Sequence, residues 1–170
     1  MEAEPAVYLI SGPMGAGKST AARLLAGRFA RGVHLEGDVF RRNIVAGREE
    51  MTPAAGDEAL AQLRLRYRLA AAAAETYADA GFTVAFEDVV AGPLLTEVSA
   101  LVRTRPCHVV VLLPSAAALA ARAGERYTSW SVEQLHGAFA RDTPRLGVWL
   151  DTSELTPEAI VDEILARSRP

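Results

Sequence analysis

Residues 11–20 read "SGPMGAGKST", and this stretch decides the fold class of the chain. The spacing Gly12-x-x-x-x-Gly17-Lys18-Ser19 matches the P-loop pattern in full. Its glycines let the backbone turn so that successive N–H groups point at one anion, and the helix that follows adds the positive end of its dipole. The apolar run "VYLI" before it favours a strand, and "AARLLAGRF" after it favours a helix. The sequence therefore predicts a cradle for the phosphates of a nucleotide.

The two residues that close the motif have distinct expected roles. We expect Lys18 to place its ammonium group on the β- and γ-phosphates. We expect the hydroxyl of Ser19 to bind Mg²⁺, a hard ion that prefers oxygen ligands. The expected nucleotide-binding residues of the loop and helix start are Gly12, Pro13, Met14, Gly15, Ala16, Gly17, Lys18, Ser19 and Thr20.

The bulk composition is that of a soluble globular protein. A chain of 170 residues, half of them apolar and 23% charged, is most simply one domain with a substantial core. The net charge of −3 disfavours long nucleic acid as a partner. No stretch reaches the roughly 20 apolar residues of a membrane span, and "MEAEPAVYLI" lacks the basic start of a secretory signal. We expect a single domain over residues 1–170, located in the cytoplasm and with no membrane contact.

Short β-branched runs alternate with helical patterns along the chain. Strands separated by helices form parallel sheets whose two faces are covered by helices, so an α/β fold is expected. Residues 48–58, "REEMTPAAGDE", are the most loop-like stretch and a candidate mobile segment. The expected strands are 7–10, 33–35, 83–86, 109–113 and 148–150, and the expected helices are 18–29, 39–46, 59–80, 94–102, 116–126, 132–141 and 156–167.

Two acidic residues end the third expected strand, in "FTVAFEDVV". Ligands of parallel α/β sheets bind beyond the carboxyl ends of the strands, where a carboxylate can orient Mg²⁺, usually through water. We therefore expect Ser19 with Glu87 and Asp88 at the metal, Asp88 being the nearer of the two carboxylates. Asp88 is also a candidate acceptor-binding residue. The alternative is that both acids are solvated at the strand end.

A second acidic strand end occurs in "VHLEGDVFRR". Asp38 could cap the following helix, because aspartate is a favoured N-cap residue. It could also face an acceptor hydroxyl and take its proton. Arg41 and Arg42 lie one helical turn further on and could hold the acceptor or a phosphate, although one of them is expected to be a solvated side chain.

Arginines recur in two later segments. In "SAAALAARAGERYTSW", Arg122 and Arg126 are four residues apart, so a helix would present them on one face, where they could stabilise charge on a transferring phosphoryl group. The alternative is a pair of exposed helix arginines. In "LRLRYR", Arg64 and Arg68 share a helix face. We expect these two side chains to be solvated rather than to contact an anionic acceptor.

Taken in this order, the residues resemble the small P-loop kinases around chloramphenicol phosphotransferase. The markers are "SGPMGAGKST", "GDVF", "VAFEDVVAGP", "LAARAGER" and "WLDTSELTPEAIVDEIL", which together span nearly the whole chain. The resemblance implies a three-layer α/β sandwich, in which a five-stranded parallel sheet has helices on both faces and a helical lid at about residues 115–130. It also implies ATP-dependent phosphorylation of a hydroxyl group with Mg²⁺.

The resemblance also assigns roles to individual residues. Asp38 falls on the proposed base of that family, Lys18 on its phosphate lysine, and Arg122 and Arg126 on its lid arginines. Asp151 and Thr152 fall where related kinases contact the adenine. The spacing Asp38-x-x-Arg41 also resembles polynucleotide 5′-kinases and other kinases of small metabolites. The segments 39–68 and 127–145, which would face the acceptor, match no substrate signature.

Three functions follow from these observations. The leading one is a kinase of a small hydroxylated molecule, with an antibiotic or a nucleoside-like metabolite as candidate acceptors. A polynucleotide or nucleoside kinase is the second, and a nucleotide-dependent switch or NTPase without an acceptor is the third. The third would need a water-positioning residue and nucleotide-sensing loops, and the sequence gives evidence of neither.

Overall fold

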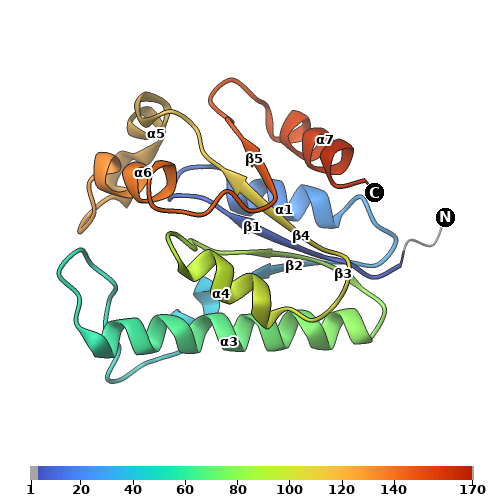
Figure 1. Ribbon diagram of the computed structural model, residues 1–170, viewed down its shortest axis with the longest axis horizontal. Coiled ribbons are helices and arrows are strands. Elements are labelled where there is room, and N and C mark those ends of the chain that lie inside the picture. Colours follow the sequence, from blue (N-terminus) through green and yellow to red (C-terminus); the bar gives the residue numbers. More distant parts are fainter. Residues whose placement is uncertain (1–3, 170) are drawn as a thin grey trace.

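A parallel sheet forms the centre of the molecule in the computed structural model, which describes residues 4–169 (Figure 1). Its five strands lie in the order β2-β3-β1-β4-β5, and every neighbouring pair is parallel. The central strand, β1, is apolar from Val7 to Ile10 and buried along its whole length, as expected for a sheet covered on both faces. The expected α/β class is confirmed. The strands are β1 (Val7–Ser11), β2 (Gly32–Glu36), β3 (Thr83–Glu87), β4 (Cys107–Leu112) and β5 (Val148–Leu150).

Helices cover both faces of this sheet (Figure 1). On one face, α1 and α7 pack together against the sheet, with Leu25 and Ile164 fully buried. On the other face lie α3 and α4, and α5 packs with α6 beside the carboxyl end of the sheet. No helix within residues 4–169 is long and apolar enough to cross a membrane. The helices are α1 (Lys18–Ala26), α2 (Asp38–Arg42), α3 (Asp57–Asp79), α4 (Leu94–Leu101), α5 (Ala116–Ala123), the short 3₁₀ helix η1 (Gly124–Arg126), α6 (Val132–Ala140) and α7 (Pro157–Arg167).

The long helix α3 owes its close packing to small residues on its inner face. Ala70, Ala74 and Ala78 are buried at helical spacing, and Tyr67 fills the space nearer the site. Alanine has no side chain beyond Cβ, so the helix axis can approach the sheet closely. This packing places the N-terminal half of α3 alongside the carboxyl ends of the strands.

The strand order brings the carboxyl ends of three strands together at the same end of the sheet. The Glu87 carbonyl oxygen accepts a 2.9 Å hydrogen bond from the N–H of Gly37. The N–H of Asp88 donates a 3.1 Å hydrogen bond to the carbonyl oxygen of Ile10. The ends of β1, β2 and β3 are therefore neighbours. The phosphate loop, the Asp38 turn and the Glu87–Asp88 pair converge because each follows one of these strands directly.

Three expected helices are shorter than the sequence pattern suggested. The first ends at Ala26, where Gly27 occupies the C-cap position. The second covers only Asp38–Arg42, and β-branched residues and a glycine follow it, all of which disfavour helix. The fifth expected helix is broken at Gly124, whose φ of 50° leaves the right-handed helical region.

Candidate active site

The loop between β1 and α1 has a geometry that only glycine adopts readily. Gly12, Gly15 and Gly17 have φ values of 151°, 85° and 91°, in the left-handed half of conformational space. A side chain on Gly12 would also collide with the carbonyl oxygen of Leu112 on β4. The loop therefore turns tightly at the end of the central strand and leads directly into the N-terminus of α1, a geometry that suits an anion.

Lys18 is the first residue of α1, and its side chain reaches back to this loop. Its side chain is buried, and Nζ donates a 2.9 Å hydrogen bond to the carbonyl oxygen of Pro13. Burial lowers the pKa of Lys18 to about 8. The positive charges of Arg66 and Arg126 lower this pKa as well, whereas the negative charges of Glu87 and Asp88 raise it. A buried ammonium group held by one neutral carbonyl has a strong affinity for phosphate oxygens.

Next to the lysine, Ser19 is joined to the end of β3. Its hydroxyl donates a 2.7 Å hydrogen bond to Oε1 of Glu87, and His34 Nε2 lies 3.5 Å from the same oxygen. Burial raises the pKa of Glu87, but His34, the Ser19 hydroxyl and the charge of Lys18 outweigh it, so the net shift is downward. Glu87 is therefore an ionised carboxylate at neutral pH.

The donor set at this position fits Mg²⁺. A serine hydroxyl and a carboxylate are hard oxygen ligands, which this ion prefers. Within residues 4–169 there is no cluster of three or more His, Cys, Asp or Glu side chains that could form a metal cage made of protein alone. A partial set of this kind would suit a magnesium ion that takes its other ligands from nucleotide phosphates and water.

Asp88, in contrast, is held by an arginine. Arg66 Nε donates to one carboxylate oxygen at 2.9 Å, Arg66 Nη2 pairs with the other, and the N–H of Val89 donates at 2.7 Å. A side chain at Gly37 would collide with this carboxylate, so the glycine makes room for it. The structure thus places Glu87 against Ser19 and Asp88 against Arg66, and which of the two carboxylates lies nearer to a metal stays a prediction.

Asp38 is the first residue of α2, and its side chain makes no capping hydrogen bond. Its carboxylate instead accepts from Arg41 Nε at 2.7 Å and lies 3.4 Å from Arg66 Nη1. Burial raises the pKa of Asp38, but these arginines and Arg42 lower it by more than burial raises it, so the net shift is downward. The structure therefore gives no support to helix capping as the role of Asp38, which is an ionised carboxylate at the cavity wall.

The two arginines of α2 differ in position. Arg41 lines the cavity and bridges Asp38 to Glu50, with Nη1–Oε1 at 2.8 Å. Arg42 lies outside the cavity lining and pairs with Glu36 at 3.0 Å and with Asp38 at 3.2 Å. Of the two, Arg41 is the one placed to meet an acceptor.

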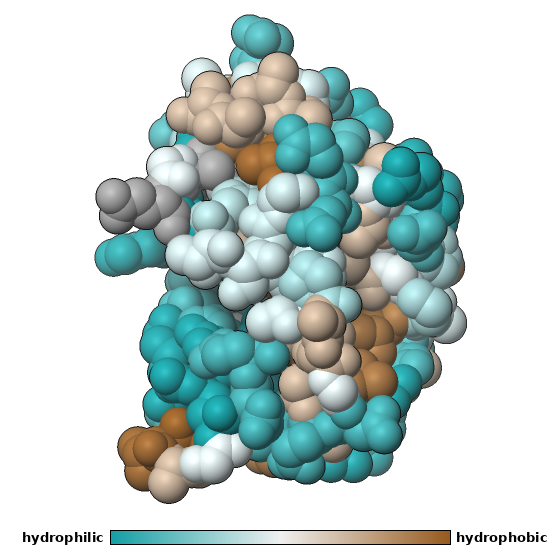
Figure 2. All heavy atoms as spheres, turned by 90° about the vertical axis from the view of Figure 1, so that its left-hand side faces the viewer, coloured by the Kyte–Doolittle hydropathy of each residue, from teal (hydrophilic) through white to brown (hydrophobic). Residues whose placement is uncertain are grey.

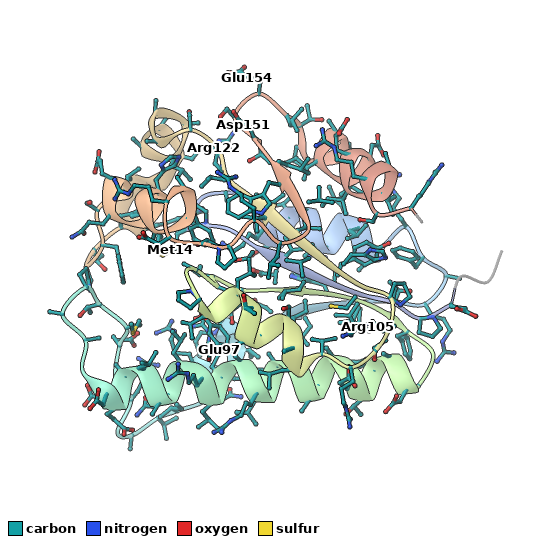
Figure 3. The ribbon with its side chains drawn as sticks, in the orientation of Figure 1. Met14, Glu97, Arg105, Arg122, Asp151 and Glu154 are labelled. Atoms are coloured by element: carbon teal, nitrogen blue, oxygen red, sulfur yellow. The ribbon has the colours of Figure 1, made fainter. Side chains whose placement is uncertain are left out.

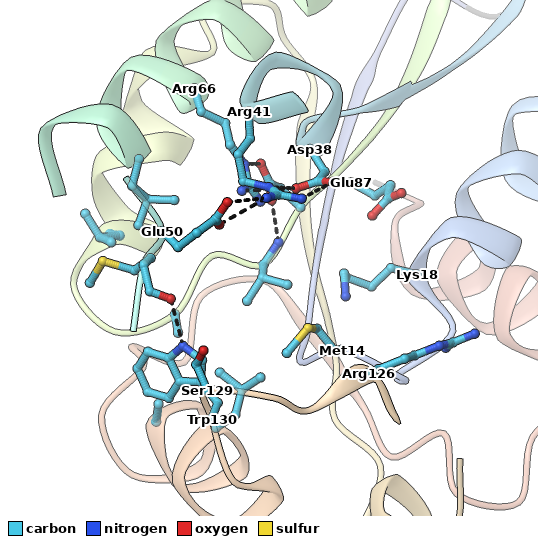
Figure 4. A pocket seen from close by; sticks show the side chains of 18 of the residues that line it. Met14, Lys18, Asp38, Arg41, Glu50, Arg66, Glu87, Arg126, Ser129 and Trp130 are labelled. Carbon is cyan, nitrogen blue, oxygen red and sulfur yellow. Dashed lines mark hydrogen bonds and ion pairs between the residues drawn. The ribbon is translucent and has the colours of Figure 1, made fainter. Parts of the chain in front are cut away.

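The arginines of the 115–130 region do not share a helix face, because Gly124 separates α5 from η1. Arg122 Nη2 donates to the carbonyl oxygens of Thr152 and Ser153, at 3.0 and 2.9 Å, and points toward the segment after β5 (Figure 3). Arg126 instead lines the cavity that contains Lys18 (Figure 4). The expectation of one arginine face is therefore wrong, and the two side chains serve different parts of the site.

The segment after β5 is fastened to the phosphate loop. Thr152 is buried, and its hydroxyl donates to the carbonyl oxygen of Ala16 at 3.4 Å. Asp151 is exposed and accepts from the N–H and hydroxyl of Ser153. This position beside the loop is compatible with the expected contact to the nucleotide base, which stays a prediction.

A cavity of about 920 Å³ opens beside these groups (Figure 4). Its lining includes Lys18, Ser19, Asp38, Arg66 and Glu87 from the strand ends and helices, together with the segment that follows η1. It also includes apolar side chains from α3, α4 and α6 at one side, namely Leu63, Leu94, Leu135 and Ala138. The cavity therefore joins the phosphate loop to the space in front of Asp38.

Two aromatic residues hold the segment after η1 in place. Tyr127 donates from its hydroxyl to the carbonyl oxygen of Met14 at 2.5 Å, which fixes the segment after η1 to the phosphate loop. Trp130 Nε1 donates to the carbonyl oxygen of Met51 at 3.1 Å, and both residues line the cavity (Figure 4). The loop-like segment 48–58 is thus one wall of the site.

Sequence reasoning missed four of these residues: Glu50, Arg66, Tyr127 and Trp130. A signal existed for Arg66, since it follows Ala59 and Leu63 on the helix face that leads to Ala70 and is otherwise apolar. An arginine on a core-facing stripe needs a buried partner. By comparison, Arg64 pairs with Glu97 on the outer surface, and neither it nor Arg68 lines the cavity.

The fold and the loop define a P-loop protein with the architecture of the small-molecule kinases. The chain belongs to the AAA domain family, which it matches over residues 7–141. No protein of curated function matches the sequence.

Solved structures of kinases share this fold. A sugar kinase from Janibacter sp. HTCC2649 is 20% identical with a TM-score of 0.67, over 97% of this chain and 94% of that one. A shikimate kinase from Acinetobacter baumannii in complex with shikimate is 19% identical with a TM-score of 0.66, over 96% and 92%. An APS kinase from Mycobacterium tuberculosis in complex with AMPPNP and APS is 16% identical with a TM-score of 0.70, over 96% of each chain.

Proposed function

We propose that this protein is an ATP-dependent phosphotransferase that phosphorylates a hydroxyl group of a small molecule. One observation carries the proposal: the ionised Asp38 faces the same cavity as Lys18 of the phosphate loop. A carboxylate across from a phosphate cradle is what a hydroxyl acceptor needs, because an alcohol is a weak nucleophile at neutral pH. The kinase structures of the same fold support this reading.

In the proposed reaction, the loop N–H groups and Lys18 hold the β- and γ-phosphates of ATP. Asp38 accepts a hydrogen bond from the acceptor hydroxyl, aims its oxygen at the γ-phosphorus and takes the proton late in the transfer. A new P–O bond forms to the acceptor, and the bond between the γ-phosphorus and the β–γ bridging oxygen breaks to release ADP. Lys18 and Arg126 stabilise the charge that develops on the phosphoryl group.

Ser19 and Glu87 would hold the Mg²⁺ that accompanies ATP. The ion would supply positive charge that offsets the negative charge of the nucleotide phosphates. Glu87 suits this task because Lys18 and its hydrogen-bonding neighbours keep it ionised. Arg122 would act at a distance from the transfer, by fastening the segment with Asp151 and Thr152 beside the nucleotide base.

The size and closure of the cavity favour a small acceptor over the end of a nucleic acid. A volume of about 920 Å³ lies within the range of drug-sized ligand sites. The contact between Trp130 and Met51 joins two segments of the cavity lining, which leaves less room for a polynucleotide. An antibiotic or a nucleoside-like metabolite is the proposed acceptor, in line with the resemblance to the chloramphenicol phosphotransferase group.

The test is a screen for ADP release. The protein with ATP and Mg²⁺ is incubated with hydroxylated antibiotics, nucleosides and sugars, and phosphorylated product is confirmed by mass spectrometry. Acceptor-dependent ADP release that Lys18→Ala and Asp38→Asn abolish is the expected result. ADP release at the same rate with and without every acceptor would contradict the proposal and favour an NTPase.

A further inference from the structure

The arginines that line the acceptor side of the cavity are already occupied by carboxylates of the chain. Arg66 holds both oxygens of the buried Asp88 and lies 3.4 Å from Asp38. Arg41 holds Asp38 at 2.7 Å and Glu50 at 2.8 Å. Each guanidinium group thus faces two acids, and its best hydrogen-bond directions are in use (Figure 4).

The same network continues through Arg42 and Arg48, and its positive and negative charges are equal in number. Arg42 pairs with Glu36 and Asp38, and Arg48 pairs with Glu50 at 3.0 Å. Four arginines, namely Arg41, Arg42, Arg48 and Arg66, therefore face four carboxylates, namely Glu36, Asp38, Glu50 and Asp88. The network as a whole offers no net positive charge to an incoming anion.

Asp142 adds a negative charge to this side of the cavity. It follows α6 and lines the cavity, and no ion pair to it occurs within residues 4–169. Apolar side chains also line the cavity, among them Leu63, Leu94 and Leu135. The face of the molecule drawn in Figure 2 is mainly hydrophilic with a few hydrophobic patches.

An anionic acceptor could bind to these arginines only by displacing the carboxylates that pair with them. A carboxylate or phosphate bound to Arg41 or Arg66 would displace an acid of the chain and leave that acid unpaired, which is unfavourable for partly buried charges. A neutral hydroxyl group can instead hydrogen-bond to the outer lone pairs of the carboxylates without disturbing an ion pair. An ammonium group would gain from Asp142.

We propose that the acceptor is an uncharged or cationic polyhydroxyl compound with an apolar segment, and that carboxylate and phosphate acceptors are rejected. This inference rests on the proposed function and names the substrate class of the same site. It sets the protein apart from the neighbour solved with shikimate, which is a carboxylate. Glu50 is the specificity-determining residue, because it keeps Arg41 and Arg48 from an anion.

The experiment compares three matched probes that share a sugar ring and a nitrophenyl group. These are 4-nitrophenyl glucoside, which is neutral, 4-nitrophenyl glucuronide, which is anionic, and 4-nitrophenyl 2-amino-2-deoxyglucoside, which is cationic. Their dissociation constants are measured by calorimetry with the full chain saturated with AMPPNP and Mg²⁺. We expect the neutral and cationic probes to bind at least about tenfold more tightly than the glucuronide.

Two variants make the test specific to the network. Glu50→Gln leaves Arg41 and Arg48 with one carboxylate fewer, so the glucuronide should gain about fivefold to tenfold relative to the glucoside. Glu97→Gln removes an acid of similar exposure that pairs with Arg64 outside the cavity, and the ratio should stay unchanged. An equal gain in both variants would show that overall charge, and not the network, sets the preference.

The remaining outcomes separate this inference from the proposed function. Binding of the glucuronide as tight as that of the glucoside, or no binding of any probe at millimolar concentration, would overturn the acceptor class. ATP with the same probes gives the second readout. Probes that bind in the expected order, while no acceptor ever receives a phosphoryl group, would overturn the kinase function and leave the acceptor class standing.

Discussion

The hydroxyl of Ser19 donates a 2.7 Å hydrogen bond to Oε1 of Glu87, a residue 68 positions further along the chain. The bond joins the first turn of α1 to the end of β3, because β1 and β3 are parallel neighbours with Ile10 opposite Glu87. It places a hydroxyl and an ionised carboxylate side by side at the mouth of the phosphate loop. The first prediction follows from this pair.

We expect Glu87→Gln to raise the Mg²⁺ concentration needed for half-maximal activity by about tenfold or more, because an amide is a weaker partner for a hard cation than a carboxylate. Titration of turnover with Mg²⁺ at saturating ATP measures the effect. Glu97→Gln, which removes an acid outside the cavity, is the control. An unchanged Mg²⁺ requirement in Glu87→Gln would show that Glu87 is not the metal carboxylate.

Lys18 is the only lysine in the chain, so amine chemistry can report on it directly. Because burial lowers its pKa to about 8, the reactive neutral amine should reach half its maximum near pH 8, well below the usual lysine range. Acetylation at Lys18, followed by mass spectrometry between pH 6 and 10, should show this midpoint, and ATP should protect the residue. A midpoint near pH 10 would contradict the buried placement.

Replacement of the same lysine should abolish transfer and leave the fold intact. Lys18→Ala removes a preorganised cation from the place where charge develops, and we expect turnover to fall by about 10²-fold or more. Circular dichroism and thermal melting serve as the control for folding. Near-normal turnover by a folded Lys18→Ala protein would be incompatible with the proposed function.

Asp38→Asn should lose turnover by roughly 10²-fold or more while ATP binding persists, because the amide cannot accept the hydroxyl proton. The arginines hold the pKa of Asp38 below its usual value of about 4, so protonation of this group should not reduce activity between pH 7 and pH 5. Turnover, nucleotide binding by calorimetry and a pH profile measure the three expectations. Turnover in Asp38→Asn equal to that of the parent protein would show that another carboxylate is the base.

Asp88→Asn should destabilise the fold by about 3–5 kcal/mol, because it leaves the buried guanidinium of Arg66 without its main counter-charge. The double variant Arg66→Met with Asp88→Leu should recover much of that loss in urea denaturation, since apolar pairs replace buried ion pairs well. Its turnover should still be low, because Asp38 loses a partner. Recovery of full activity would show that the pair is purely structural.

Ligand binding should order the segment that carries the cavity-facing arginine and aromatic residues. Hydrogen exchange over residues 116–130 should slow when AMPPNP and Mg²⁺ are added, because phosphate gives Arg126 a partner. The effect should be smaller in Trp130→Phe, which keeps an aromatic ring but removes the hydrogen bond to Met51. Unchanged exchange, with nucleotide bound as shown by calorimetry, would contradict a lid at this position.

Local sequence patterns were enough for the phosphate loop, the strands and most helices, since a glycine-rich turn and alternating apolar runs act within a few residues. They also placed Glu87 and Asp88 at the carboxyl end of a strand, where a site was expected. The break in the helix expected over 116–126 was harder to predict, because one glycine at position 124, with a φ of 50°, redirects Arg126 away from Arg122.

Tertiary structure alone decided how the charges of the site pair. The register of β1 with β3 puts Glu87, and not Asp88, against Ser19. The rotation of α3 on the sheet turns Arg66 toward Asp88 and Asp38, 22 and 28 residues away in sequence. Electrostatic pairing depends on distances across elements that the chain sets only when it folds, whereas the loop motif depends on backbone geometry that the sequence carries locally.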